Sequence, residues 1–237
     1  MSSTNSPTVQ HSTTSTTAPR SDGAPVGPAV QTDAAPSTSA AWFDAAFDGQ
    51  PLMAILRGMG VERSLELART AWDLGIDAVE IPLQSATDLE ALSAVVREGR
   101  ERNKEVGAGT VLDAATVEAA AQAGAAFTVS PGLDLDVVRA SEAAGMPSLP
   151  GVATATEVQR AYVAGLRWLK AFPASLLGES WFGAMRGPFP EARFVATGGV
   201  NARNAPAYLD AGVRVVAVGS ALEDRAELDR LAEVIAR

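Results

Sequence analysis

The feature that most constrains the fold is an alternation of short apolar segments with Ala-rich helical patterns. Continuous apolar segments separated by helices are typical of a parallel sheet whose two faces are both covered. Eight such units follow one another, and their apolar segments are 52–58, 78–83, 105–110, 126–132, 147–152, 168–174, 193–200 and 214–222. Eight evenly spaced units predict an α/β fold of the closed (β/α)8 TIM-barrel type, rather than the rival doubly wound sheet.

The helix boundaries are marked by residues with known terminal preferences. The helical patterns 62–75 and 113–124 end on glycine, which takes the left-handed C-cap conformation without a steric penalty. Thr154 and Glu157 have the spacing of a capping box that begins a helix. Before the first strand, 39–47 predicts a short amphipathic helix, which we expect to close the bottom of the barrel.

The first residues differ in composition from the rest of the chain. Residues 1–38 are rich in Ser, Thr, Pro and Ala, which offer too little apolar surface to offset the entropy of ordering. We therefore expect a disordered tail at 1–38 and one barrel domain at 39–237. The tail resembles neither a signal peptide nor a mitochondrial presequence, and no apolar run is long enough for a membrane helix. We expect a cytoplasmic protein without a membrane partner.

Composition also excludes several kinds of chemistry. The chain has no cysteine, and its one histidine, His11, lies in the tail, so we expect no metal or other cofactor and no Cys- or His-based catalysis. A formal net charge of −9 argues against a nucleic-acid partner, because phosphate backbones need basic surface. Catalysis must therefore depend on Lys, Arg, acidic side chains, hydroxyls or backbone groups.

Lys170 is the first candidate catalytic residue. The chain contains 17 arginines but only two lysines, and Lys170 stands in the apolar run 168–174 while Lys104 stands in a polar one. Burial in an apolar barrel disfavours the charged ammonium, and a neutral amine can form a Schiff base with a ketone, which arginine cannot do. The alternative is a lysine at the strand rim that extends its charge into solvent. We favour the catalytic role.

Glu80 is the second candidate, because a carboxylate within an apolar strand is costly unless it is paired or used. One interpretation is an ion pair with Arg57 on the neighbouring strand. The other is a proton shuttle for iminium chemistry, and we favour it.

Further polar and glycine residues are expected at the carboxyl ends of the strands, where barrel enzymes place their sites. Gly198 and Gly199 end the seventh apolar segment, and Gly219 and Ser220 end the eighth. Backbone N–H groups in such positions commonly hold a phosphate. The remaining polar candidates at these strand ends are Arg57, Thr110, Ser130 and Thr197.

Several motifs, in order and spacing, resemble the KDPG/KHG aldolase family, whose members are class I aldolases acting on 2-keto-3-deoxy-6-phospho sugar acids. The motifs are "AILRG", "EIPLQS", "GAGTVL", "SPG", "PGVATATE", "LKAFPA" and "TGGV", from about residue 51 onward. "AILRG", "EIPLQS" and "PGVATATE" look most like the galactonate-type members. Gln84 stands where the gluconate type has arginine, whereas Thr197 and "SPG" look gluconate-like.

The resemblance implies a role for each matching residue. Lys170 would form the Schiff base and Glu80 would act as the general acid and base. Arg57 and Thr110 would bind the carboxylate end of the substrate, and Thr197 its middle. The distal phosphate would be held by Gly198, Gly199, Gly219 and Ser220. The resemblance also implies a homotrimer, a phosphorylated keto-deoxy sugar acid as the small-molecule partner, and pyruvate and glyceraldehyde 3-phosphate as products.

Two other classes of function are compatible with a phosphate-binding barrel. A synthase or isomerase of the same fold would share the glycines at the seventh and eighth strands but needs no lysine on the sixth. A non-catalytic barrel that serves as an interaction module is the second alternative, and the N-terminal tail is its only support.

Overall fold

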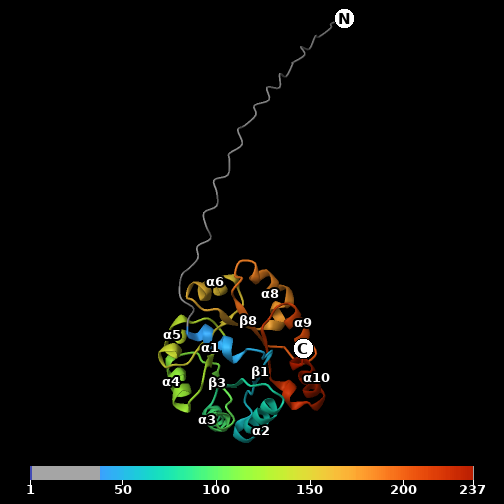
Figure 1. Ribbon diagram of the computed structural model, residues 1–237. Helices are drawn as coiled ribbons and strands as arrows, with labels where there is room; N and C mark the ends of the chain where they lie inside the picture. Colours follow the sequence, from blue (N-terminus) through green and yellow to red (C-terminus); the bar gives the residue numbers. More distant parts are fainter. Residues whose placement is uncertain (2–37, 237) are drawn as a thin grey trace. The chain divides into compact units, whose positions relative to one another are not determined.

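The computed structural model describes Met1 and residues 38–236 (Figure 1). The tail predicted to be disordered lies outside the described residues except for Met1 and its last residue, Thr38, which begins the first helix. In the described part, short strands alternate with helices as the sequence predicts. None of the helices in this part of the chain is long and apolar enough to cross a membrane.

The strands are parallel to one another and occupy all eight of the predicted segments. They are β1 (Leu52–Ile55), β2 (Val79–Pro82), β3 (Val106–Gly109), β4 (Thr128–Val129), β5 (Ser148–Leu149), β6 (Gly151–Val152), β7 (Trp168–Ala171), β8 (Arg193–Thr197) and β9 (Val215–Val218).

Helix α1 (Thr38–Ala46) precedes the first strand and lies over the middle of the barrel in Figure 1, whereas the later helices surround the strands. The later helices are α2 (Gly60–Asp73), α3 (Ala86–Glu101), α4 (Ala114–Ala123), α5 (Leu135–Ala143), α6 (Ala155–Val163), α7 (Ala174–Leu177), α8 (Glu179–Arg186), the 3-10 helix η1 (Ser220–Glu223), α9 (Ala205–Asp210) and α10 (Arg225–Ile235). The predicted capping box at Thr154 and Glu157 is present at the start of α6.

The strand order shows how the barrel closes. The order is β5-β4-β3-β2-β1-β9-β8-β7-β6, so β5 pairs with β4 at one end and β6 pairs with β7 at the other. Only Pro150 separates β5 from β6. Proline has no backbone N–H to donate, so it divides one predicted strand into two short pieces. The (β/α)8 barrel is confirmed, with its fifth strand interrupted at this proline.

Helix α1 closes the N-terminal end of the barrel, as the sequence predicts. Phe43 and Phe47 are buried in one apolar cluster with Phe127 and Trp168, whose side chains come from within the barrel. The Phe47 and Trp168 rings lie 5.1 Å apart, and Asp44 accepts a hydrogen bond of 2.8 Å from the Trp168 indole. Because the bottom of the barrel is filled in this way, an internal site is left only at the opposite end.

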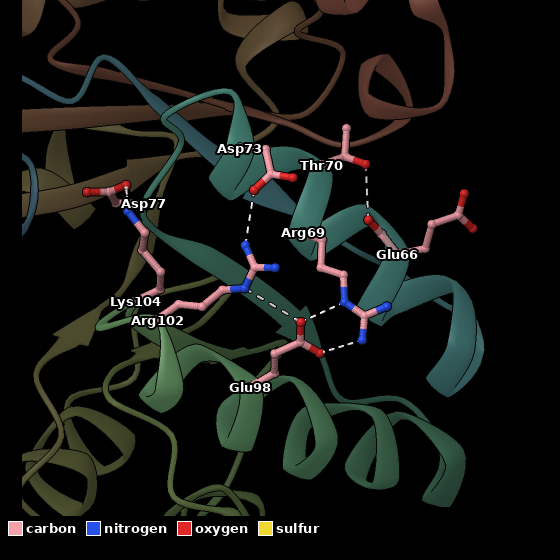
Figure 2. A network of polar contacts seen from close by, with 8 residues as sticks. All are labelled: Glu66, Arg69, Thr70, Asp73, Asp77, Glu98, Arg102 and Lys104. Atoms are coloured by element: carbon pink, nitrogen blue, oxygen red, sulfur yellow. Dashed lines mark hydrogen bonds and ion pairs between the residues drawn. The ribbon is translucent and has the colours of Figure 1, made fainter.

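On the outside of the barrel, α2 and α3 are joined by a network of charged residues (Figure 2). Arg69 donates two hydrogen bonds to Glu98, of 2.6 and 2.7 Å, and Arg102 pairs with both Glu98 and Asp73. Each carboxylate in this part of the network therefore has an arginine partner.

The same view includes Lys104, the second lysine of the chain, which pairs with Asp77 near the start of β3. Lys104 thus belongs to the outer polar surface.

Candidate active site

The interior of the barrel changes from apolar to polar along the strands. Side chains alternate between the two faces of a strand, so residues two apart point the same way. Trp168 on β7 and Val195 on β8 belong to the apolar cluster at the bottom. Lys170 and Thr197 lie two residues further on, and this places them in the next interior layer. Glu80 on β2 follows buried Ala78 in the same manner.

Lys170 and Glu80 face each other in this layer. Their Nζ and Oε1 atoms are 3.9 Å apart, and their side chains are 3 % and 0 % exposed. Lys170 therefore does not extend its charge to solvent, and the alternative role at the strand rim is wrong. The Lys170 ammonium also lies 5.3 Å from the centroid of the Phe172 ring.

Both carboxylate oxygens of Glu80 are buried and lack a hydrogen-bond partner among the described residues, and so does the hydroxyl of Thr197. An unpaired buried polar group costs about 1–3 kcal/mol, and more if it is charged. Such groups are uncommon in proteins unless a ligand or a reaction uses them. Three of the six buried unpartnered side-chain atoms in the described residues lie in this one layer.

A glycine on β3 makes room for Glu80. A Cβ atom on Gly109 would collide with the Glu80 carboxylate. Gly151 of β6, which is paired in register with Lys170, instead admits the backbone of Pro131. Gly109 was not among the candidate residues from the sequence. A glycine within a strand often marks a close approach by another group, so the glycines of "GAG" at 107–109 could have indicated this contact.

Arg57 lies near the site but does not pair with Glu80. Its Nη1 atom donates to Gln84 Oε1 at 2.8 Å and approaches Thr110 Oγ1 at 3.5 Å, while the ion pair of Glu80 is with Lys170. The alternative in which Arg57 neutralises Glu80 is therefore wrong. Thr110 has a φ of 58°, a left-handed conformation that is strained for a β-branched residue.

The predicted phosphate-binding residues lie where β8 and β9 end. Gly198 and Gly199 follow β8 and have φ of 94° and 73°, conformations that favour glycine. Gly219 follows β9, and Ser220 begins the 3-10 helix η1. Parallel neighbouring strands end at the same edge of the sheet, so these two segments are adjacent.

Ser130, also predicted to lie at a strand end, is buried and donates a 2.7 Å hydrogen bond to the carbonyl of Val111. Its hydroxyl is thus used within the fold. No group of three or more His, Cys, Asp or Glu side chains suited to a metal ion occurs in the described residues.

The fold and this layer define a (β/α)8 barrel protein with a buried lysine and carboxylate at its centre. The family model described as KDPG and KHG aldolase matches residues 44–235. The chain belongs to the KDPG and KHG aldolase family.

Relatives of two substrate types are similar to this chain. The 2-dehydro-3-deoxy-6-phosphogalactonate aldolase of Escherichia coli (strain K12) is 38% identical over 173 residues, which cover 73% of this chain and 84% of the relative. The 2-dehydro-3-deoxy-phosphogluconate aldolase of Pseudomonas aeruginosa is 40% identical over 158 residues, covering 66% and 70%.

Among solved structures, the KDPG aldolase of Legionella pneumophila, with pyruvate captured as a covalent carbinolamine intermediate, has a TM-score of 0.69 and 28% identity. The alignment covers 81% of this chain and 95% of that one.

Proposed function

We propose that this protein is a class I aldolase that cleaves 2-dehydro-3-deoxy-6-phosphogalactonate to pyruvate and D-glyceraldehyde 3-phosphate. The observation that carries the proposal is the buried Lys170, which faces an unsatisfied Glu80 at 3.9 Å in the open end of the barrel. The covalent carbinolamine of pyruvate in the related Legionella pneumophila aldolase supports chemistry at an amine.

In this mechanism the neutral amine of Lys170 attacks the C2 ketone of the substrate. Proton transfers give a carbinolamine, which loses water to form an iminium ion. Removal of the proton from the C4 hydroxyl breaks the C3–C4 bond, the electron pair moves into the iminium as an enamine, and the aldehyde leaves. Protonation of the enamine carbon and hydrolysis of the imine then release pyruvate and restore the lysine.

Glu80 is assigned the proton transfers. A general acid or base acts within hydrogen-bond reach of the proton it moves, or through one water molecule. The 3.9 Å between Lys170 Nζ and Glu80 Oε1 is longer than a hydrogen bond, so a hydroxyl on the bound substrate or a water molecule is expected to bridge the two groups. Neither carboxylate oxygen of Glu80 has a hydrogen-bond partner among the described residues, so both can accept a hydrogen bond from that hydroxyl or water.

The remaining candidate residues would each bind a different part of the substrate. Arg57 and Thr110, at the ends of β1 and β3, would bind the carboxylate. Thr197, at the end of β8, would bind the middle of the chain through its unpartnered hydroxyl. The phosphate would lie at the far end, against the backbone N–H groups of Gly198, Gly199, Gly219 and Ser220.

The alternative substrate is the gluconate epimer, 2-dehydro-3-deoxy-6-phosphogluconate, or 4-hydroxy-2-oxoglutarate. Gln84, which accepts a hydrogen bond from Arg57, favours the galactonate type, while Thr197 favours the gluconate type. Relatives named for each substrate are similarly close to this chain. Steady-state cleavage of the two purified epimers tests the assignment directly, and the galactonate epimer is expected to have the higher kcat/KM.

Reductive trapping tests the mechanism. With pyruvate and borohydride, the label is expected on Lys170, as located by mass spectrometry. Lys104 is the internal control, since it pairs with Asp77 on the outer surface. Lys104→Arg should keep the label and Lys170→Arg should lose it. Label on Lys104 alone, or no adduct, would refute the Schiff-base mechanism and favour a synthase or a non-catalytic barrel.

The family resemblance also supports a homotrimer, one barrel domain at 39–237, and reaction in the cytoplasm without a metal cofactor. Light scattering on the purified chain measures the oligomer. Activity is expected to survive EDTA, and activity that is lost and then restored by Mg²⁺ or Zn²⁺ would contradict a class I mechanism.

A further inference from the structure

Glu227 is a buried acid outside the barrel interior. It lies on α10, its side chain is 7 % exposed, and it faces the segment that connects β8 to α9. Its carboxylate accepts hydrogen bonds from the backbone N–H of Ala202 at 3.2 Å, from Arg203 Nε at 2.9 Å and from Arg230 Nη1 at 2.9 Å. The hydrogen bond from Arg203 lowers the pKa of Glu227, which keeps this side chain ionised.

The segment that Glu227 holds carries one half of the proposed phosphate site. Ala202 comes three residues after Gly199, and Asn204 connects Gly199 to Asn201, the residue before Ala202. Asn204 Nδ2 donates to the Gly199 carbonyl at 3.0 Å, and its Oδ1 accepts from the N–H of Asn201 at 2.8 Å. The hydrogen bond that Glu227 accepts from the N–H of Ala202 therefore restrains the same turn that contains Gly199.

Apolar packing covers only part of this segment on the side toward α10: Ala202 is buried in the same cluster as Leu231 and Val234 of α10. A cavity of about 450 Å³ lies there, and it is lined by Asn201, Arg203, Asn204, Ser220, Ala221, Asp224 and Glu227. The cavity separates the segment after β8 from η1, which carries the other half of the proposed phosphate site. Beside the cavity, the hydrogen bonds of Glu227 to Ala202 and Arg203 are polar contacts that connect α10 to the segment after β8.

We infer that Glu227 is a positioning residue for the phosphate end of the substrate, acting through Ala202 and Arg203 on the turn at Gly198 and Gly199. This inference rests on the proposed function. Glu227 does not touch the reacting atoms, so it should influence how tightly the phosphate is bound and leave the bond-breaking step unchanged.

The experiment compares Glu227→Gln with Glu98→Gln in the full chain. Glu98 is a matched control because it also bridges two arginines from a helix, but it does so between α2 and α3, far along the chain from the β8 and β9 ends. Kinetics are measured with the phosphorylated substrate and with its unphosphorylated counterpart.

Glu227→Gln is expected to raise KM for the phosphorylated substrate about five- to tenfold, with kcat within about twofold of wild type. Kinetics on the unphosphorylated counterpart and trapping of pyruvate should not change. Inorganic phosphate should inhibit the variant less than the wild type. Glu98→Gln should alter none of these values.

The inference is overturned if Glu227→Gln behaves like Glu98→Gln, or if KM rises equally on both substrates. Arg203→Ala is a second variant, chosen because the Arg203 side chain is 72 % exposed, and thermal melting is its control for folding. It should raise KM for the phosphorylated substrate about two- to threefold. A wild-type chain that neither traps pyruvate nor cleaves the sugar acid refutes the proposed function, whereas an active wild type with a silent Glu227→Gln refutes this inference alone.

Discussion

Two charged regions of the molecule differ in how their carboxylates are satisfied. In the network between α2 and α3, Glu98 receives three contacts from Arg69 and Arg102 at the protein surface (Figure 2). In the barrel, Glu80 has one distant partner, Lys170, and no hydrogen bond, although it is fully buried.

The difference identifies which region is built for stability and which for chemistry. Exposed ion pairs contribute about 0–1 kcal/mol each, so the outer network can change with little effect on function. Removing one partner of a buried pair costs about 3–5 kcal/mol, because it leaves an uncompensated charge. A buried ion pair without hydrogen bonds, such as Lys170 and Glu80, is therefore better explained by a role in the reaction than by a role in stability.

The largest expected effect comes from removing the amine at the barrel centre. Lys170→Met should lower kcat/KM for cleavage by about 10⁴-fold or more, because the covalent intermediate no longer forms. The measurement is steady-state cleavage coupled to pyruvate formation. Thermal melting is the control for folding, and cleavage at more than a hundredth of the wild-type rate by a folded variant would contradict the role of Lys170.

The next effect concerns the carboxylate. Glu80→Gln keeps the size of the side chain but removes the proton carrier, so kcat should fall by about 10²- to 10⁴-fold. Trapping of pyruvate by borohydride should continue at a lower rate. Near-normal turnover would mean that Glu80 serves only to pair with Lys170.

Substitution of Thr197 should have a smaller effect, on selectivity. Its hydroxyl is buried and unpartnered, and a hydroxyl of one epimer at C4 would satisfy it. Thr197→Val should lower kcat/KM on the gluconate epimer about two- to tenfold more than on the galactonate epimer, since one hydrogen bond is worth roughly 0.5–1.5 kcal/mol. Equal losses of kcat/KM on both epimers would show that Thr197 does not distinguish the configuration at C4.

The smallest effect is expected in the outer network. Glu98→Gln should lower the free energy of unfolding by less than about 1 kcal/mol, because Arg69 is half exposed and solvent screens the pair. Chemical denaturation at neutral pH measures it, with Glu118→Gln on α4 as an exposed control.

The same pair has a defined pH dependence. The hydrogen bond from Arg69 lowers the pKa of Glu98 in the folded chain. The contribution of Glu98 to stability is thus present above the pKa of the unfolded chain and is lost as pH falls through the lower folded value. The difference between wild type and Glu98→Gln should therefore vanish in acid.

Local patterns were enough to predict the barrel and its central pair. The apolar segments and helix ends repeat with a period that is visible along the chain, and Lys170 is conspicuous because its neighbours are apolar. The break at Pro150 was not predicted, although the proline that divides the strand is visible in the sequence. The sequence also left open whether Arg57 pairs with Glu80. Gln84, which is the partner in the structure, lies only four residues after Glu80, and the direction of the side chains decides between the two.

Gly109 and Glu227 show the other limit of a sequence taken alone. Gly109 matters because it lies against Glu80 from a neighbouring strand. Glu227 reaches Ala202 across 25 positions of the chain. Both roles depend on which elements become neighbours in space, and no local signal specifies the contact.

The placement of Lys104 has a practical consequence for attaching the protein to a solid support. Lys104 precedes β3, at the end of the barrel where the strands begin, and its side chain is 24 % exposed against 3 % for Lys170. Of the two lysine side chains, Lys104 is therefore the one that a coupling reagent can reach, and coupling at this lysine joins the resin to the closed base of the barrel. The opposite end of the barrel would then face the flowing solution.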